Sequence, residues 1–327
     1  MEANASILTS LEILQLPEVS VVYVNYNTFD LLRDSVESLE KHSSMPFEII
    51  VVDNNSGDIE RNMLEEWLSI KAVKNVRLIF SDMNMGFAAA NNLAAEHATS
   101  KYLFFLNPDT LVMNDVVSLF CNFMERSEPS VAACGAYLLN GDHAPTSSYG
   151  NFPGLLLELC NVGLGLSWLL SGYYKKHIAI GSAMWSRRIL QVPYIVGADI
   201  FIRSEAFKTV GKFDENFFMY YEETDLFFRL RKSRLRSYIL PEARIVHLEG
   251  GAVGQSSADV FNYNKYEMIL TSKLYYYKKW HAKILPAIKG LIRMQITVQY
   301  FKGKWGNDLR RLSTIYARIV HEKGGAS

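Results

Sequence analysis

The stretch VSVVYVNYN, residues 19–27, decides how this sequence folds. Its first part, VSVVYV, is a short apolar run rich in β-branched side chains, bounded by Pro17 and Asn25. Such a run is typical of a strand buried on both faces, so we predict a parallel strand over residues 19–24. The apolar residues that follow have helical spacing, and the expected inward side chains are Leu31, Leu32, Val36 and Leu39.

The same alternation continues for three more strands. FEIIVVD at 47–53 and VRLIF at 76–80 predict strands, and YLFFLN at 102–107 predicts a fourth. Helical patterns over 59–70 and 87–98 separate them. This alternation of strand and helix predicts a parallel sheet with helices on both faces.

Polar residues follow each of these strands where its apolar run ends. The four clusters are Asn25-Tyr26-Asn27, Asp53-Asn54, Asp82 with Asn84, and Asn107-Pro108-Asp109. Ligands of parallel sheets bind beyond the carboxyl ends of the strands, so the clusters predict a site on one rim. Carboxylate and amide oxygens suit a hard cation, Mg²⁺ or Mn²⁺, that bridges the protein to a diphosphate.

The composition is that of a globular protein. The chain has 327 residues, of which 49% are hydrophobic and 21% charged, and this excludes disordered and collagen-like classes. Its length suggests two domains, or one large α/β domain with an appendage. Its apolar runs are shorter than the roughly 18 residues of a transmembrane helix. The N-terminal stretch lacks the basic start of a normal signal peptide, and three cysteines without metal-ligand spacing favour a reducing compartment.

The charges are divided unevenly along the chain. Residues 262–327 hold 13 Lys and Arg against 3 Asp and Glu, a net +10, and the 261 residues before them hold 21 against 31, a net −10. Aromatic and aliphatic side chains are interleaved with the basic ones. Such a segment fits an anionic membrane surface, but it also fits a basic helical appendage packed on the acidic domain. Nucleic acid is the other polyanion that such a segment fits, and we do not expect it as a partner.

The second half of the chain is less regular. LLLELCNVGLGLSWLL at 155–170 is apolar but interrupted by Glu158 and Asn161, so it predicts either a core helix or an interfacial patch. Residues 194–214 predict a strand, a short helix and a turn, and TDLFFRLRKS at 224–233 predicts a helix. SYILP and RIVH predict two further short strands.

Missing motifs exclude several kinds of nucleotide chemistry. The absence of a G-x-x-x-x-G-K-[ST] loop argues against a P-loop NTPase. NYNTF follows the first strand, where a dinucleotide fold would have G-x-G-x-x-G and a sugar nucleotidyltransferase a glycine-rich loop with arginine. The chain also lacks a G-x-S-x-G nucleophile elbow.

Six motifs, in order, resemble those of family 2 glycosyltransferases with the GT-A fold. They are VSVVYVNYN, FEIIVVDNNSGD, NMGFAAANN, YLFFLNPDT, GADIFIRSEAF and FFMYYEETDLFFRLR, within residues 18–255. The resemblance is greatest to the rhamnosyltransferase-like branch, which builds O-antigen and other bacterial surface polysaccharides. It implies an α/β fold, in which a mostly parallel, Rossmann-like sheet is flanked by helices and followed by a basic helical C-terminal extension.

The resemblance also implies how the chain is divided. We expect an N-terminal extension over 1–17 and a glycosyltransferase domain over 18–255. Within this domain, 18–112 is the expected nucleotide-binding half and 113–255 the acceptor half. A basic, aromatic helical region over 256–327, suited to membrane association, is expected to follow.

For the nucleotide, the resemblance implies that Tyr26 stacks on the base and that Asp53 accepts a hydrogen bond from N3–H of thymine or uracil. Asp53-Asn54 stands where many members have two aspartates, so either residue can be the one that touches the base. Asn84 and Gly86 match the donor-contacting N-x-G-F loop, although Gly86 also suits a simple turn. Alternatively, Tyr26 packs on the next helix and Asp53 ends its strand in a turn. The other nucleotide-binding residues expected here are Val24, Asn25 and Asn27.

For the metal and the donor sugar, Asn107-Pro108-Asp109 occupies the place of the family's Asp-x-Asp motif. Asp109 is the expected ligand of a divalent cation, and Asn107 offers an amide oxygen in place of the first carboxylate. The cation would offset the charge that builds on the departing diphosphate. His247 matches a late metal-binding histidine, although a lone histidine at a strand end is more often structural. Asn91, Asn107 and Asp199 are expected on the donor-sugar or acceptor side, unless Asn91 and Asp199 are simply packed polar residues.

For catalysis, Glu222-Glu223-x-Asp225 is the expected acid/base cluster, because close carboxylates raise one another's pKa. The family usually has aspartate as the base at the position of Glu223, so here a longer side chain must reach the same hydroxyl. Glu222 would orient the acceptor or pair with Arg229, and Asp225 would also interact favourably with the helix dipole. One base and no separate nucleophile imply a single displacement with inversion at the anomeric carbon.

Together these implications describe an inverting glycosyltransferase. The expected donor is dTDP-rhamnose, or else a UDP-sugar, and the expected acceptor is a polyprenyl-diphosphate-linked or other surface glycan. We expect the protein in the cytoplasm, peripheral on the inner face of the cell membrane. The alternative, motivated by Asn107 and Glu223, is a non-catalytic peripheral membrane or assembly protein on the same fold.

Overall fold

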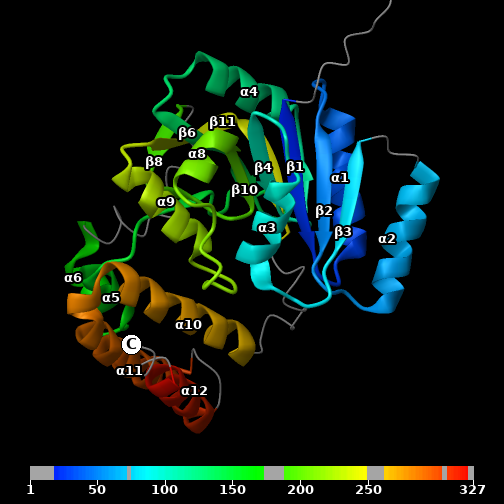
Figure 1. Cartoon of the computed structure of the whole chain (residues 1–327). Coiled ribbons are helices and arrows are strands. Elements are labelled where there is room, and N and C mark those ends of the chain that lie inside the picture. The colour runs from blue at the N-terminus through cyan, green and yellow to red at the C-terminus, as the bar shows by residue number, and fades with distance from the viewer. Residues whose placement is uncertain (1–17, 72–74, 173–187, 249–260, 304–307, 323–327) are drawn as a thin grey trace, which may run out of the picture.

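The chain forms a helix-flanked sheet with a layer of helices along one side (Figure 1). The computed structural model describes residues 18–71, 75–172, 188–248, 261–303 and 308–322. The expected extension over 1–17 and the expected boundary near 255 therefore lie outside the described residues.

The first half of the sheet confirms the predicted parallel order. Strands β1 (Val19–Asn25), β2 (Glu48–Asp53), β3 (Val76–Phe80) and β4 (Tyr102–Leu106) are all parallel and stand in the order β3-β2-β1-β4. Helices α1 (Phe29–His42), α2 (Asp58–Lys71) and α3 (Gly86–Glu96) connect them. Because parallel strands end on the same edge, the polar residues that follow β1, β2 and β4 meet there.

The second half of the sheet mixes both directions. Strand β10 (Asp199–Arg203) is antiparallel to β4 and to β6 (Val131–Leu139), and β6 runs parallel to β11 (Arg236–His247). The short strands β5 (Thr110–Val112) and β8 (Leu190–Val192) pair with β11 in antiparallel fashion. Helices α4 (Val116–Arg126), α8 (Ser204–Thr209) and α9 (Glu222–Lys232) cover this half, and β7 (Tyr149–Gly150) and β9 (Tyr194–Ile195) form a separate small ribbon.

The prediction of two short strands over SYILP and RIVH is wrong in one respect. Both belong to the single strand β11, whose register against β6 shifts between Leu240 and Arg244. Pro241 has no N–H to give to the ladder, so the chain bulges over these residues and then resumes pairing.

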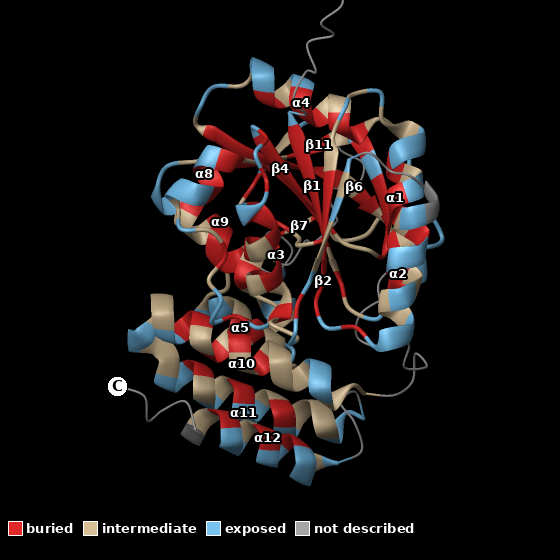
Figure 2. Cartoon of the chain, turned by 45° about the vertical axis from the view of Figure 1, so that its right-hand side comes forward, coloured by how far each residue is buried: buried red, intermediate tan, exposed pale blue. Residues whose placement is uncertain are grey.

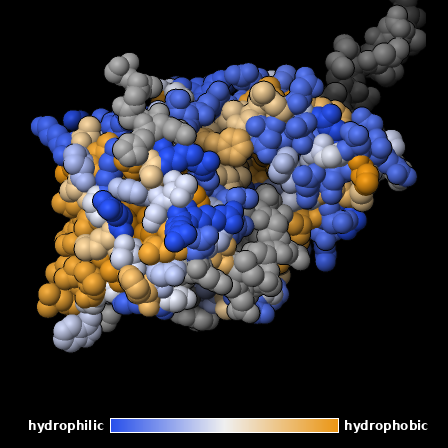
Figure 3. Space-filling view, turned by 90° about the horizontal axis from the view of Figure 1, so that it is seen from below, coloured by the Kyte–Doolittle hydropathy of each residue, from blue (hydrophilic) through white to orange (hydrophobic). Residues whose placement is uncertain are grey.

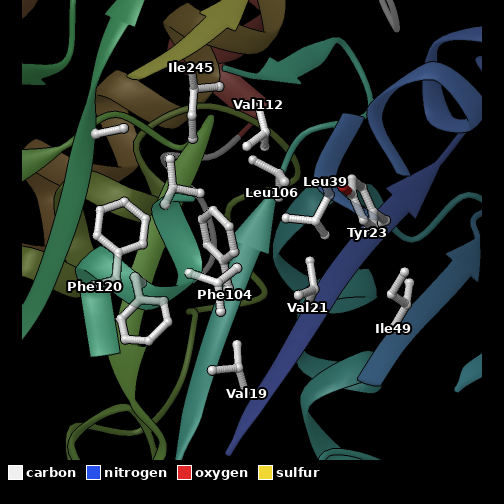
Figure 4. Close-up of a cluster of buried hydrophobic side chains, with 14 of the residues drawn as sticks. Val19, Val21, Tyr23, Leu39, Ile49, Phe104, Leu106, Val112, Phe120 and Ile245 are labelled. Atoms are coloured by element: carbon white, nitrogen blue, oxygen red, sulfur yellow. The ribbon is translucent and has the colours of Figure 1, made fainter. Parts of the chain in front are cut away.

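Two hydrophobic cores cover the two faces of the sheet. On one face Val19, Val21 and Tyr23 of β1 pack with residues of α1 and α4, as the close-up in Figure 4 shows for part of this core. On the other face Val22 and Phe105 pack with alanines of α3 and with side chains of α8 and α9. Figure 2 shows the result, with the central strands β1, β2 and β4 largely buried and helices buried only on their inner sides, whereas the edge strand β3 is partly exposed. Helices therefore cover both faces, as predicted.

The apolar segment over 155–170 is neither one continuous core helix nor one continuous exposed apolar surface. It forms α5 (Leu155–Asn161) and α6 (Leu166–Leu169), separated by Gly163 and Gly165, which have φ of 94° and 82°. Positive φ favours glycine, so these two residues end one helix and start the next. Helix α5 buries Glu158 and Cys160, whereas α6 buries none of its residues.

The basic C-terminal segment is helical, as predicted, and packs on the sheet domain. It consists of α10 (Tyr263–Trp280), the 3₁₀ turn η1 (Ala282–Ile284), α11 (Leu285–Phe301) and α12 (Leu309–Glu322), with an apolar core of its own. Lys273 of α10 pairs with buried Glu158 at 2.8 Å, and Lys279 pairs with Asp214 at 2.7 Å. Within the described ranges, no helix combines the length and apolar character needed to cross a membrane.

Candidate active site

A cavity of about 520 Å³ lies beyond the carboxyl ends of β1, β2 and β4. Its walls come from these strand ends, from the loop before α9, from the end of β11 and from the first turn of α10. The predicted site residues that line it are Val24, Tyr26, Asn54, Asn84, Gly86, Asn107, Asp109, Glu222, Glu223 and His247. Val24 and His247, which are 223 positions apart in the sequence, thus line one cavity.

Asp53 lies behind the wall of this cavity. Asn25 Nδ2 donates to Asp53 Oδ1 at 3.0 Å, and Asp53 Oδ2 accepts from the backbone N–H of Ser56 at 3.1 Å and from Arg61 Nε at 3.2 Å. Asp53 is fully buried and both of its oxygens are engaged. The arrangement therefore differs from the predicted contact with a base, because Asp53 and Asn25 instead hold the turn that follows β2.

Asn54 is the residue of this pair that faces the cavity. Its Nδ2 donates to Asn84 Oδ1 at 3.0 Å, and its Oδ1 accepts from the backbone N–H of Met85 at 2.9 Å. The backbone N–H of Gly86 also donates to Asn84 Oδ1, at 3.0 Å. These bonds join the ends of β2 and β3 into one rigid edge, beside half-buried Tyr26.

Asn27, Asn91 and Asp199 do not line the cavity. Asn27 is exposed, and its Oδ1 accepts from the backbone N–H of Gly57 at 3.0 Å. Asn91 Nδ2 donates to the carbonyl oxygen of Phe87 at 2.9 Å, within its own helix. Asp199 is fully buried in the sheet, where one oxygen accepts from the backbone N–H of Ala136. Asn91 and Asp199 thus make the packing contacts of the structural alternative, and Asn27 contacts the turn after β2.

Burial has an electrostatic consequence for Asp199. Its other oxygen, Oδ1, has no hydrogen-bond partner within the part of the chain that the structure describes. Removal from water disfavours the charged form and raises the pKa of Asp199 well above its ordinary value. Burial therefore favours the protonated form of Asp199 inside the sheet.

Asp109 and His247 form a close pair at the cavity wall. His247 Nε2 lies 3.3 Å from Asp109 Oδ1, and both side chains are largely buried. The pairing of β5 with β11 explains the contact, because His247 stands opposite Thr110, the neighbour of Asp109. Asn107 lines the same wall. The Asp-x-Asp position and the late histidine thus meet, although 138 positions separate them.

This pair fits a divalent cation in its chemistry. A carboxylate with an imidazole suits Mn²⁺ well, whereas Mg²⁺ prefers oxygen ligands. No group of three His, Cys, Asp or Glu side chains able to hold a metal occurs in the described residues. A cation held by Asp109 and His247 therefore needs further ligands from a bound substrate or from water.

Glu222 and Glu223 face the cavity from the start of α9. The two residues before them, Tyr220 and Tyr221, have φ of 68° and 69°, an uncommon conformation for two successive non-glycine residues. Such backbone strain is typical of functional sites, where it sets the direction of the next side chains. Here it turns both carboxylates toward the cavity at the first turn of the helix.

Both carboxylates are poorly solvated. In the described structure, one oxygen of each is buried without a hydrogen-bond partner. Burial, and then the charge of Glu223, raises the pKa of Glu222 well above its ordinary value of 4.5, and burial raises the pKa of Glu223. Burial thus favours the neutral form of both carboxylates, and the nearby Glu223 adds to this effect for Glu222. A carboxylate pair with raised pKa values suits proton exchange with a substrate hydroxyl.

Asp225 does not belong to this pair, which corrects the predicted cluster of three. It is fully buried on another side of α9, where it accepts from Arg229 Nε at 2.8 Å, Lys279 Nζ at 2.6 Å and Trp280 Nε1 at 2.7 Å. Arg229 thus pairs with Asp225 rather than with Glu222. Asp225 holds α9 to α10 and has no access to the cavity.

Several lining residues were not anticipated. Tyr220 and Met219 belong to the motif that ends in the glutamates, so their nearness to the site had a signal in the sequence. Lys265 comes from α10, in the basic segment, and had none. The other unanticipated lining residues are Thr28, Phe87, Val196, Gly197 and Ala198.

Comparisons with known proteins show the family of the chain. The family model described as Glycosyl transferase family 2 matches residues 20–211. The O-antigen biosynthesis protein RfbC of Myxococcus xanthus is 28% identical over 249 residues, which are 72% of this chain but only 18% of that protein. An N-acetylglucosaminyl-diphospho-decaprenol L-rhamnosyltransferase of Mycobacterium tuberculosis is 24% identical over 253 residues, which are 73% of this chain and 78% of the relative.

A solved structure supports the fold. The mannosyltransferase PcManGT from Pyrobaculum calidifontis, solved with GDP-Man and Mn²⁺, matches with a TM-score of 0.55 at 15% identity. The match covers 93% of this chain and 85% of the other. At this identity the likeness confirms the predicted GT-A architecture, and the bound Mn²⁺ shows that the architecture can hold a divalent cation.

Proposed function

The chain belongs to glycosyl transferase family 2, and we propose that it moves a sugar from a nucleoside diphosphate donor to a lipid-linked or surface glycan. The donor we favour is dTDP-rhamnose, and a UDP-sugar is second. One observation carries this proposal: the Asp109–His247 pair and the Glu222–Glu223 pair line the same cavity. A donor sugar bound in this cavity would therefore lie near both the residues for the metal and diphosphate and the base for the acceptor hydroxyl.

The donor nucleotide would lie along the edge formed by β1 and β2. Tyr26 would stack on the base, and Asn54 rather than Asp53 would touch it, because Asn54 lines the cavity. Asn84 and Gly86 would contact the donor beside them. The M. tuberculosis relative, by its name a rhamnosyltransferase, supports the choice of rhamnose.

Asp109 and His247 would hold the cation, and Asn107 would add an amide oxygen. When bound, the cation offsets the negative charge that builds on the leaving diphosphate. Asp109 would be its anionic ligand. Asp109→Ala should therefore remove the dependence of donor binding on Mn²⁺, and unchanged metal-dependent binding would contradict this assignment.

Glu223 is the proposed general base. It would take the proton of the acceptor hydroxyl as that oxygen attacks the anomeric carbon. The bond from the anomeric carbon to the diphosphate oxygen breaks with its electron pair on the diphosphate, and the configuration inverts. Glu222, kept neutral by burial and by its neighbour, would donate a hydrogen bond that orients the acceptor.

We further propose that the protein works in the cytoplasm, peripheral on the inner face of the cell membrane. An exposed apolar face supports this: Trp168 and Leu169 of α6 are 81% and 69% exposed, and Leu164 is 57% exposed. Figure 3 shows hydrophobic residues gathered on the side where Figure 1 places α5 and α6. Lys302 donates to the carbonyl oxygen of Gly163, so a basic side chain borders this face. By its name, the M. tuberculosis relative acts on a polyprenyl diphosphate-linked sugar, an acceptor found in membranes.

The first test is a thermal-shift titration of the purified protein. We would use dTDP, UDP, GDP and CDP, each with and without Mn²⁺ or Mg²⁺, because a ligand of the native state raises the melting temperature. A shift with dTDP or UDP that grows with metal is expected. No shift with any nucleotide would contradict the proposed donor class, and binding without any sugar transfer would favour the non-catalytic alternative.

Membrane association has its own test. We expect the protein to sediment with vesicles of phosphatidylglycerol and phosphatidylcholine, and less with phosphatidylcholine alone. The double change Trp168→Ser and Leu169→Ser should reduce sedimentation, whereas Ile59→Ser, at a residue 78% exposed on α2, should not. Equal sedimentation of all variants, or none at low salt, would contradict the proposal.

A further inference from the structure

Lys265 is the one lysine or arginine among the described residues that line the cavity. It lies in the first turn of α10, far along the chain from the motifs of the sheet domain. Its side chain is exposed, and its Nζ lies 6.0 Å from the centre of the Tyr220 ring. Lys265 makes no ion pair with any residue that the structure describes, so its charge is available to a ligand.

Two other lysines of α10, unlike Lys265, form ion pairs with the sheet domain. Lys273 pairs with Glu158, and Lys279 pairs with Asp214 and Asp225, and both lie on the face that packs against the sheet domain. These contacts fix the helix, and Asn262 Oδ1 accepts from the backbone N–H of Lys265 at 2.9 Å, which fixes its first turn. The backbone of Lys265 is thus held in place at the cavity that this residue lines.

The carboxylates that line the cavity favour a positively charged side chain where a diphosphate binds. Asp109, Glu222 and Glu223 line it, and the proposed substrates bring a diphosphate with further negative charge. A carboxylate-lined site repels a diphosphate unless cations are placed near it, and a lysine ammonium is a compact positive charge with three hydrogen-bond donors. Tyr220 comes two positions before Glu222 and lines the same cavity, so the 6.0 Å between the Lys265 Nζ and the Tyr220 ring places the ammonium group near the loop that leads to the glutamates.

We infer that Lys265 is the cationic anchor for a diphosphate group in this cavity. The inference rests on the proposed function, and it assigns to the C-terminal helical layer a direct part in substrate binding. Two substrates can supply the group, the nucleoside diphosphate donor and a polyprenyl-diphosphate-linked acceptor. The test separates them.

The variants are Lys265→Gln, which removes the charge, and Lys265→Arg, which keeps it, in the full chain. Lys283→Gln is the matched control, because Lys283 is an exposed lysine of η1 that does not line the cavity. The donor arm compares the dissociation constants of dTDP and of thymidine by calorimetry with Mn²⁺, and of UDP and uridine if wild type prefers them. The acceptor arm compares KM for a polyprenyl-diphosphate-linked sugar with KM for a neutral alkyl glycoside of the same sugar.

We expect Lys265→Gln to weaken one of the two diphosphate ligands by about tenfold or more, the effect of one charge-assisted hydrogen bond. The matching ligand without the diphosphate should be unaffected, and Lys265→Arg should restore most of the loss. Loss in the donor arm identifies the donor diphosphate as the ligand, and loss in the acceptor arm identifies the acceptor diphosphate.

Two outcomes would overturn the inference. One is that neither arm changes by more than the Lys283→Gln control does. The other is that charged and neutral ligands weaken equally, which indicates a structural role for Lys265. If the wild-type protein binds no nucleoside diphosphate, the proposed function itself fails, so the two failures are distinguishable.

Discussion

Gly86 and Phe218 approach so closely that a Cβ atom on Gly86 would lie 2.3 Å from the carbonyl oxygen of Phe218. The neighbouring Phe87 N–H donates to that same oxygen at 2.8 Å. The loop that carries the Asn84–Gly86 edge therefore rests directly on the loop that leads to Glu222 and Glu223. The donor side and the proposed base are connected through this one backbone contact.

Gly86→Ala should separate these loops. The substitution adds a clash with backbone atoms and places alanine at φ of 81°, so we expect a loss of stability of at least about 2 kcal/mol and weaker donor binding. Chemical denaturation and nucleotide titration measure the two effects. Gly290→Ala, in α11 with nothing near its Cβ, should instead stabilise by about 0.5–1 kcal/mol. Similar results for both variants would contradict this role of Gly86.

Glu223→Gln should reduce kcat about 10²–10⁴-fold, because glutamine cannot accept the acceptor proton. Nucleotide binding should remain, since Glu223 is proposed to act on the acceptor. Glu222→Gln is the control: glutamine resembles the neutral form that burial imposes on Glu222, so it should keep most of the activity. Measuring kcat for both variants tests this assignment. A greater loss of kcat in Glu222→Gln would make Glu222 the base and Glu223 the orienting residue.

Glu222→Gln should also make stability less dependent on pH. The pKa of Glu222 is raised in the folded protein, so its contribution to stability is complete below about pH 4.5 and is lost as pH rises toward the folded pKa. The loss is at most about 1.4 kcal/mol per pH unit in that window. The variant should therefore melt at a higher temperature than wild type at pH 7 and at nearly the same temperature at pH 4.

The groups that face Glu222 do not reverse this sign. Tyr220 stays neutral through the window, because burial and then the charges of Glu222 and Glu223 raise its pKa to about 12. The pKa values of Tyr194 and Tyr221 are also raised by burial, and Lys265 lines the same cavity. A difference in melting temperature that does not change between pH 4 and pH 7 would refute the assignment of a raised pKa to Glu222.

Asp225→Ala should destabilise the fold without removing chemistry. It leaves Arg229, Lys279 and the indole of Trp280 without their shared partner, and we expect a loss of roughly 3 kcal/mol. Asp30→Ala breaks an exposed pair with Arg33 and should cost less than about 1 kcal/mol. Urea denaturation compares them. Folded Asp225→Ala should keep a substantial kcat, and a loss as large as that of Glu223→Gln would return Asp225 to the catalytic group.

The alternation of apolar runs was enough to predict the order of elements. Each buried parallel strand is apolar along its length, as VSVVYV is, and each helix repeats its apolar residues with its own period. Because parallel strands end on one edge, Asn54, Asn84 and Asp109 could be assigned to one rim before any coordinates. The irregular second half was harder, since the bulge at Pro241 and the glycine break after α5 depend on what packs around them.

The sequence by itself therefore determined the sheet, the rim and the family, because these follow from local patterns and ordered motifs. Only the tertiary structure decided which carboxylates face the cavity. Residues 223 and 225 point about 200° apart around a helix, and Asp225 faces inward because Lys279 and Trp280 reach it from α10. The same packing brings Lys265 to the cavity wall. Contacts between residues so far apart in the chain depend on how the helices pack, and local sequence patterns do not determine that packing.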